Sequence, residues 1–150
     1  MTLLQNDPIT QLAFSVYENK GVFAVLLGSG LSRSAEIPTG WEITLDLVRR
    51  VAEAQGTPTQ SDWAKWYREK TSQEPNYSVL LEEIASSPDE RRAILHRYIE
   101  PDEQDREEGR KTPTKAHHAI AQLVRAGYVR VIVTTNFDRL MENALREQGI

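Results

Sequence analysis

Two short apolar runs, each ended at once by a polar loop, constrain the fold of this chain more than any other feature. Val22–Leu27 is followed by a Gly-Ser-Gly loop at 28–30, and Val129–Thr134 by a Thr-Asn-Phe-Asp loop at 135–138. The continuous run Val22–Leu27, half of it β-branched or aromatic, suits a strand that is buried on both faces of a parallel sheet, and Val129–Thr134 is expected to be a second strand. The sequence therefore predicts two strands of one parallel sheet.

Helical patterns fill most of the remaining chain. Apolar residues recur at helical spacing after Asp7-Pro8, after a capping box at Thr39–Glu42 and after Thr114. Residues 57–100 are expected to form a small helical subdomain, and the polar segment 100–113 an exposed charged loop. Because strands separated by helices are typical of α/β folds, we expect a Rossmann-like parallel sheet with helices on both faces and a helical insertion.

Two strands alone would leave both edges of such a sheet bare. The last residues, Gly149-Ile150, have the pattern of a helix stop followed by the start of another strand. We therefore expect residues 1–150 to be the N-terminal part of a larger domain, truncated at its C-terminus.

Composition narrows the functional classes. The chain has 150 residues, a formal net charge of −4 and no cysteine. An acidic chain offers no electrostatic footprint for nucleic acid, and one without cysteine has no disulfide, thiolate zinc site or thiol nucleophile. The start of the chain shows no signal peptide, and no apolar run approaches the roughly 20 residues of a membrane-spanning helix. We expect a cytoplasmic protein that contacts neither nucleic acid nor a membrane.

The two polar loops are the candidate site, because ligands of open parallel sheets bind outside the carboxyl ends of the strands. The glycine loop lets backbone N–H groups approach a pyrophosphate, with the hydroxyls of Ser29 and Ser32 close by. The second loop supplies the amide of Asn136 and the carboxylate of Asp138, which can orient hydroxyls and a water. Each loop alone has a plainer interpretation. The first lacks the third glycine of a dinucleotide fingerprint, since Arg33 stands there, and Asn136 suits a helix N-cap.

Together the motifs resemble the sirtuin-like domains of bacterial antiphage defence proteins. The resemblance rests on Gly-Ser-Gly-Leu-Ser at 28–32, Ile-Pro-Thr-Gly-Trp at 37–41 and Thr-Thr-Asn-Phe-Asp at 134–138. It runs from about Val22 to Ala144 and is absent from the middle helical region. It implies that the chain binds NAD as a substrate.

The resemblance also implies roles for individual residues. Asn136 would hold the nicotinamide ribose and the attacking water, and Asp138 would contact the nicotinamide carboxamide; both are candidate catalytic residues. Trp41 is a candidate wall of the nicotinamide pocket, and Thr135 stands where deacylases carry glutamine. The residues expected to bind the cofactor are Gly28, Ser29, Gly30, Ser32, Trp41 and Thr135.

Departures from the deacylase pattern favour the NAD-hydrolysing branch, which cleaves NAD to nicotinamide and ADP-ribose. Thr-Gly-Trp at 39–41 replaces the Asp-Phe-Arg of deacylases, and their four-cysteine zinc module cannot exist here. The family's catalytic histidine lies after the asparagine motif, and because none follows Asn136 we expect it beyond residue 150. The expected role is an antiphage effector with a C-terminal sensor or regulatory domain and a homo-oligomeric assembly. The alternatives are a module that senses NAD or ADP-ribose without turnover and, less favoured, a deacylase.

The histidines carry no metal prediction. His117 and His118 point about 100° apart on a helix, and no third ligand lies at useful spacing. We expect His117 to pack before the second strand, and His96 to lie on the surface. Trp63, Trp66 and Tyr67 are expected in the core of the helical subdomain.

Overall fold

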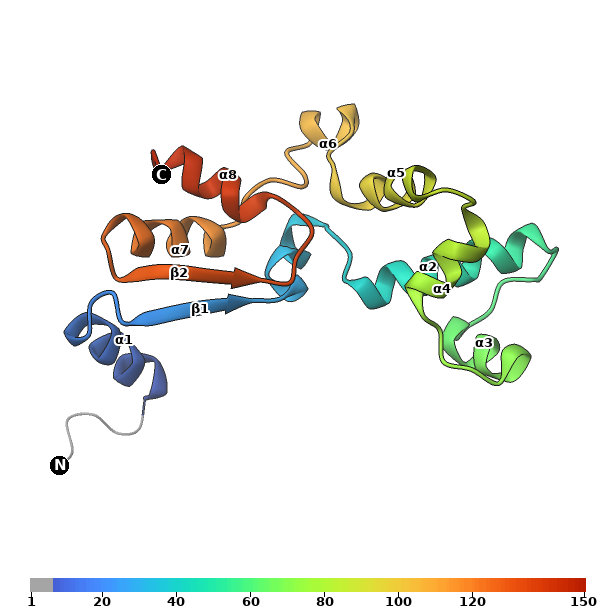
Figure 1. Cartoon of the computed structure of the whole chain (residues 1–150), viewed down its shortest axis with the longest axis horizontal. Helices are drawn as coiled ribbons and strands as arrows, with labels where there is room; N and C mark the ends of the chain where they lie inside the picture. Colours follow the sequence, from blue (N-terminus) through green and yellow to red (C-terminus); the bar gives the residue numbers. More distant parts are fainter. Residues whose placement is uncertain (1–6) are drawn as a thin grey trace. The chain divides into compact units, whose positions relative to one another are not determined.

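A computed structural model describes residues 7–150 and shows a mixed α/β chain. The elements of the described residues are α1 (Pro8–Glu18), β1 (Phe23–Leu27), the 3-10 helix η1 (Ser29–Ala35), α2 (Gly40–Ala54), α3 (Trp63–Thr71), α4 (Tyr77–Ile84), α5 (Pro88–Ile99), α6 (Glu103–Glu107), α7 (Lys115–Arg125), β2 (Val129–Thr134) and α8 (Leu140–Glu147) (Figure 1). They form two compact units. The first comprises the described residues up to Ser32 together with Thr112–Ile150, and the second comprises Arg33–Lys111. No described helix is long and apolar enough to span a membrane.

The two strands pair in parallel, as the sequence predicts. Val25 lies opposite Ile132, and Leu27 lies opposite Thr134, so both strands end at the same level. The N–H of Thr135 then donates to the carbonyl of Leu27 at 3.1 Å, which continues the pairing one step past β2. The loops that follow the strands therefore leave the sheet at one edge, as parallel pairing requires.

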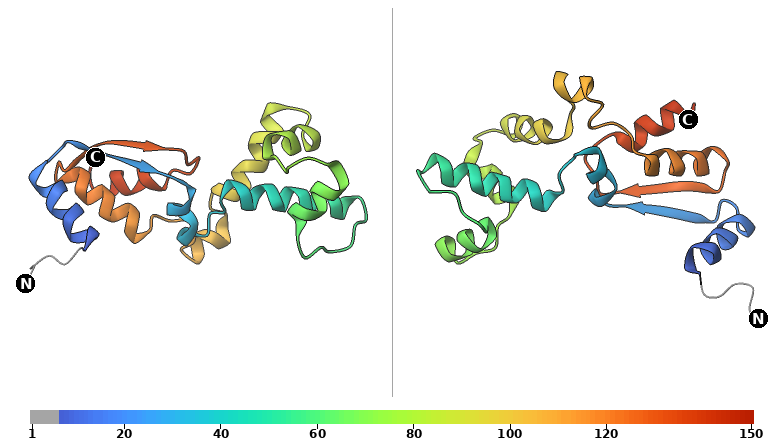
Figure 2. Two further views of the ribbon diagram at one scale, coloured as in Figure 1. Left: turned by 90° about the horizontal axis from the view of Figure 1, so that it is seen from below. Right: turned by 180° about the vertical axis from the view of Figure 1, so that it is seen from behind.

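One face of the sheet carries the core of the first unit. Helices α7 and α8 lie against this face (Figure 2), where Leu27, Ala121, Met141 and Ala144 are buried together. Side chains of a strand alternate between faces, and those of the opposite face are exposed: Ala24, Leu26, Val131 and Val133. The prediction that the strand at Val22–Leu27 is buried on both faces is therefore wrong for the described chain, because the described helices cover only one face of the sheet.

Helix α1 begins as predicted, with the carboxylate of Asp7 accepting from the N–H groups of Ile9 and Thr10. Ile9, Leu12, Phe14 and Tyr17 are nevertheless exposed, and no residue of α1 is buried. The helix is held to the first unit at its end, where Tyr17 stacks on Tyr128 with ring centroids 6.1 Å apart. Periodicity thus predicted the helix, but it did not show whether the apolar stripe is covered.

The second unit is helical and has a core of its own. Ile43, Leu47, Val48, Tyr67, Leu80 and Leu81 form its buried cluster, against which Trp63, Trp66, Ile94, Leu95 and Tyr98 pack. The predicted capping box at Thr39–Glu42 is present, and the expected core role of Trp63, Trp66 and Tyr67 is confirmed. His96 is exposed, as expected.

The segment 100–113 is more ordered than an exposed charged loop. It contains α6, whose Asp105 is buried and pairs with Lys111 Nζ at 2.9 Å and Arg110 Nε at 3.0 Å. Lys111 Nζ also donates to the carbonyls of Arg97 and Glu100 at the end of α5. The hydrogen bond from Lys111 lowers the pKa of Asp105. Most of the segment is exposed, but charge alone did not show that opposite charges pair within it.

Leu47→Ala should unfold the helical unit at lower denaturant. Leu47 is 1% exposed at the centre of the cluster, and truncating a buried leucine costs about 2–5 kcal/mol. Val79→Ala in the same unit, at a position 42% exposed, should change stability by no more than about 0.5 kcal/mol. Urea unfolding followed by the fluorescence of Trp63 and Trp66 measures both. Equal effects of the two variants would contradict this core.

Candidate functional site

The two loops meet in a buried polar cluster made of Ser32, Asn136 and Asp138. Ser32 Oγ donates to Asp138 Oδ2 at 2.8 Å, and Asn136 Nδ2 donates to Ser32 Oγ at 3.2 Å. Ser32 is 0% exposed and Asp138 is 9% exposed. The cluster exists because β1 and β2 end at the same level of a parallel sheet, which brings together residues about a hundred positions apart in sequence.

Local hydrogen bonds fix the second loop. The N–H of Asn136 donates to Thr134 Oγ1 at 3.0 Å, and the N–H of Leu140 donates to Asp138 Oδ1 at 3.0 Å. The carboxylate of Asp138 therefore satisfies an N–H group at the start of α8 with one oxygen and holds Ser32 with the other. Interpreting Asn136 as the cap of this helix is wrong, because its side chain turns toward Ser32 instead.

The carbonyl oxygen of Asn136 is left without a partner. The hydroxyl proton of Ser32 is committed to Asp138, so the group of Asn136 that faces Ser32 must be its amide nitrogen. Asn136 Oδ1 then points elsewhere, and it is a buried acceptor with no hydrogen-bond partner among the described residues. An unsatisfied buried acceptor costs about 1–3 kcal/mol. Such an atom is suited to accept a hydrogen bond from a ligand hydroxyl or a bound water.

The glycine loop is open to solvent. Gly28, Ser29 and Gly30 are exposed, and a Cβ atom added to either glycine would meet no atom within 4 Å. Neither glycine has a positive φ, so the backbone does not require glycine at either position. The loop thus presents a backbone surface that no described residue of the first unit covers.

Two other predicted binding residues lie outside the cluster. The hydroxyl of Thr135 is directed to the carbonyl of Leu27 at 3.5 Å, so this residue joins the strand ends. Trp41 lies in the first turn of α2, in the second unit, and is 50% exposed. Their roles toward a ligand stay predictions.

His117 is the residue near the cluster to which the sequence assigned only packing. It is 0% exposed, and its Nδ1 accepts from the N–H of Thr114 at 3.1 Å. Burial lowers the pKa of His117, while the negative charge of Asp138 acts in the opposite direction. The sequence contained one signal of the contact between His117 and Thr114, which is a histidine three residues after a helix-capping threonine. Among residues 7–150 no three histidine, aspartate or glutamate side chains are grouped as metal ligands.

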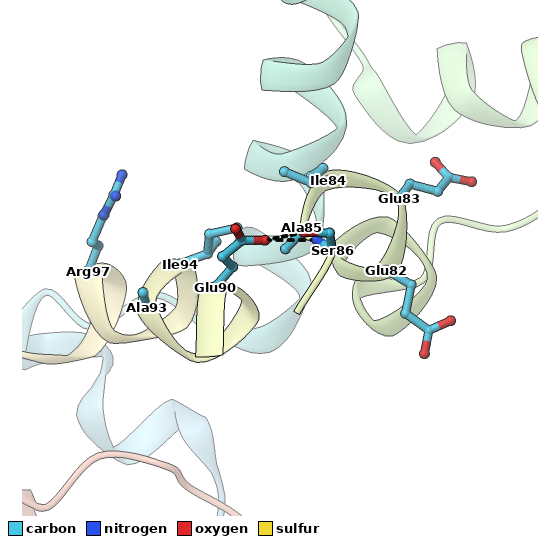
Figure 3. A pocket seen from close by; sticks show the side chains of 9 residues that line it. All are labelled: Glu82, Glu83, Ile84, Ala85, Ser86, Glu90, Ala93, Ile94 and Arg97. Atoms are coloured by element: carbon cyan, nitrogen blue, oxygen red, sulfur yellow. Dashed lines mark hydrogen bonds between the residues drawn. The ribbon is translucent and has the colours of Figure 1, made fainter. Parts of the chain in front are cut away.

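A hollow of about 550 Å³ also lies between α4 and α5, and its polar groups do not converge. Figure 3 shows Glu82, Glu83 and Arg97 pointing in different directions around it. The carboxylate of Glu90 is occupied by hydrogen bonds from the N–H and hydroxyl of Ser86. The polar cluster of the first unit is therefore the better candidate site.

Comparison with known proteins leaves the function to be argued from these residues. No protein-family model matches the chain, and no curated protein compared with it matches either.

A double-mutant cycle should show that Ser32 and Asp138 are energetically coupled. Ser32→Ala removes a donor to a buried carboxylate and leaves Asn136 Nδ2 unpaired, which should cost about 1–3 kcal/mol. Combined with Asp138→Ala, the loss should fall short of additivity by about 1 kcal/mol or more. Ser29→Ala, at an exposed serine of the same loop, should combine additively with Asp138→Ala. Additive losses in both pairs would argue against the hydrogen bond.

Proposed function

We propose that this chain is the NAD-binding part of a sirtuin-like NAD glycohydrolase, which cleaves NAD to nicotinamide and ADP-ribose. One observation carries the proposal. The unpartnered Oδ1 of Asn136 lies in a hydrogen-bonded polar cluster at the carboxyl end of two parallel strands, where α/β folds bind nucleotides. The proposal includes a Rossmann-like fold for the domain to which these residues belong.

The chemistry needs positioning more than a covalent nucleophile. Cleavage of the nicotinamide–ribose bond passes through an oxocarbenium-like centre, which ordered dipoles and an aligned water stabilise. Asn136 is suited to this task because Ser32 holds one of its amide protons and thereby fixes the amide plane. Its Oδ1 is then free to accept from a ribose hydroxyl or from the attacking water.

The glycine loop is the proposed pyrophosphate site. Its open backbone would let N–H groups approach phosphate oxygens closely, and the exposed hydroxyl of Ser29 lies in the same loop. Asp138 would contact the nicotinamide carboxamide. We assign binding and positioning to this chain, since no histidine follows Asn136 and His117 is buried. The base that completes hydrolysis would come from outside these residues.

The wider proposal follows the resemblance. The activity would serve antiphage defence in the cytoplasm, in a homo-oligomer controlled by a sensor or regulatory domain. A module that binds NAD or ADP-ribose without turnover is the second candidate. It is favoured by the lack of any exposed histidine in the cluster.

Asn136→Ala should weaken NAD binding while leaving the fold intact. Loss of one hydrogen bond to a ribose hydroxyl costs about 1–1.5 kcal/mol, or about tenfold in Kd. Asn76→Ala is the matched control, because Asn76 Oδ1 caps α4 and its loss should cost about 1 kcal/mol of stability without changing Kd. Titration calorimetry with NAD and a thermal melt measure both variants.

An assay of nicotinamide release separates the two candidate functions in a protein that pairs these residues with the base. Release that falls about 100-fold in Asn136→Ala, equivalent to about 3 kcal/mol of barrier, supports the hydrolase. Saturable binding without release in that protein supports the sensing module, whereas these residues alone are expected to bind without release under either function. No saturable binding of NAD or ADP-ribose by the parent chain would refute the proposal.

Gly30→Ala should weaken binding of ADP-ribose without destabilising the protein. A Cβ here meets no protein atom, and replacing glycine at a compatible φ stabilises by about 0.4–1 kcal/mol. The same methyl would obstruct a pyrophosphate lying on the loop, so we expect Kd for ADP-ribose to rise about tenfold. Adenosine, which has no pyrophosphate, is the control ligand. Unchanged affinity for ADP-ribose would place the pyrophosphate elsewhere.

A further inference from the structure

Unusual backbone geometry is concentrated around η1, which begins inside the glycine loop. η1 is a 3-10 helix of seven residues, although 3-10 runs longer than three or four residues are uncommon. Glu36, the residue after η1, has a φ of 63°, and Lys111 has a φ of 50°. They are two of the three non-glycine residues with positive φ among the described residues. Backbone of this kind persists only where surrounding contacts hold it, and it occurs often at functional sites.

Lys111 makes the contacts that hold the end of η1. Its N–H donates at 2.9 Å to the carbonyl of Ala35, the last residue of η1. Its side chain is 12% exposed, and its ammonium group pairs with Asp105 at 2.9 Å and donates to the carbonyls of Arg97 and Glu100. These three acceptors match the three donors of an ammonium group. The side chain of Lys111 is therefore anchored while its backbone N–H binds η1.

The geometry of η1 connects Ala35 to the polar cluster. Ser32 lies three residues before Ala35, and side chains three residues apart lie on the same side of a 3-10 helix. Ser32 is 0% exposed and Ala35 is 6% exposed, so this side of η1 is buried. Hydrogen bonds of a 3-10 helix have poorer geometry than those of an α-helix, which turns 100° per residue rather than 120°. Relaxation of η1 toward an α-helix would rotate Ser32 by about 60° relative to Ala35, away from Asn136 and Asp138.

We propose that Lys111 is a positioning residue of the polar cluster. By holding Ala35, it keeps η1 in the 3-10 conformation that brings the hydroxyl of Ser32 to the side chain of Asn136. The effect of Lys111 on NAD affinity rests on the proposed function, whereas its effect on Ser32 does not. The plainer alternative is that Lys111 only stabilises the ends of α5 and α6.

Lys111→Met tests the effect on Ser32 without any ligand. Methionine fills much of the same volume but has no ammonium group. Positioning predicts that the side-chain amide resonances of Asn136 shift, because Ser32 Oγ accepts from Asn136 Nδ2. It also predicts about tenfold faster hydrogen exchange of the Leu31 N–H, which donates to the carbonyl of Gly28 at the start of η1.

Tyr98→Phe is the matched control. It removes a 2.6 Å hydrogen bond to Asp46 elsewhere in the helical unit, so it should leave the Asn136 resonances and the Leu31 exchange rate at their parent values. Equal changes in Tyr98→Phe and Lys111→Met would overturn the proposal, because they would show a general loosening of the helical unit.

Asp105→Asn is a second, milder variant in case Lys111→Met does not fold. It keeps an acceptor for the ammonium group of Lys111 but removes the negative charge, so it should shift the Asn136 resonances in the same direction by a smaller amount. Folded variants that both leave these resonances and the Leu31 exchange rate unchanged would overturn the proposal.

Titration with NAD carries the test to the ligand. Lys111→Met should raise the Kd for NAD about fivefold, and Tyr98→Phe should leave it unchanged. An unchanged Kd in a variant whose Asn136 resonances have shifted would overturn the role of Lys111 in ligand binding. If the parent chain binds no NAD, the proposed function fails, and the resonances of Asn136 still decide whether Lys111 positions Ser32.

Discussion

Parallel pairing of β1 with β2 is the constraint on which the candidate site depends. Leu27 lies opposite Thr134, so both polar loops begin at the same level of the sheet. A shift of the register by one residue would turn each side chain of β2 to the other face and separate Ser32 from the second loop. The pairing is supported by one buried face alone, so α7 and α8, which cover that face, indirectly hold the site together.

The helices, the strands and the meeting of the loops could be predicted because each depends on local spacing and on one rule of sheet geometry. Asp7, Thr39 and Thr114 stand where helices begin, and the apolar runs give both strands. What covers an apolar surface could not be predicted, since periodicity shows which face is apolar but not its partner. The exposure of Leu26 and of most apolar residues of α1 was therefore not predicted from the sequence.

Hydrogen bonds between residues far apart in the sequence could not be predicted, for a different reason. Asn136 is suited both to capping a helix and to holding a ligand, and only the position of Ser32 decides between them. The segment that contains Asp105 and Lys111 was predicted to be exposed, because charge patterns carry no information about burial. His117 was assigned to packing, and the structure buries it, but the charge that opposes the lowering of its pKa by burial is that of Asp138, 21 positions away in the sequence. The effect of Asp138 on the pKa of His117 therefore had no sequence signal.

Two unsatisfied atoms, one in the cluster and one in the nearby His117, bear on whether the cluster is a structural feature or a binding site. A turn that served only to join β2 to α8 would need the capping carboxylate of Asp138 and no buried amide beside it. Asn136 Oδ1 and His117 Nε2 instead remain buried without partners, each at a cost of about 1–3 kcal/mol. Proteins retain such groups where a ligand, a water or a nearby charge offsets the cost. Asn136 Oδ1 has no hydrogen-bond partner among the described residues, and a bound hydroxyl is a group that would satisfy it.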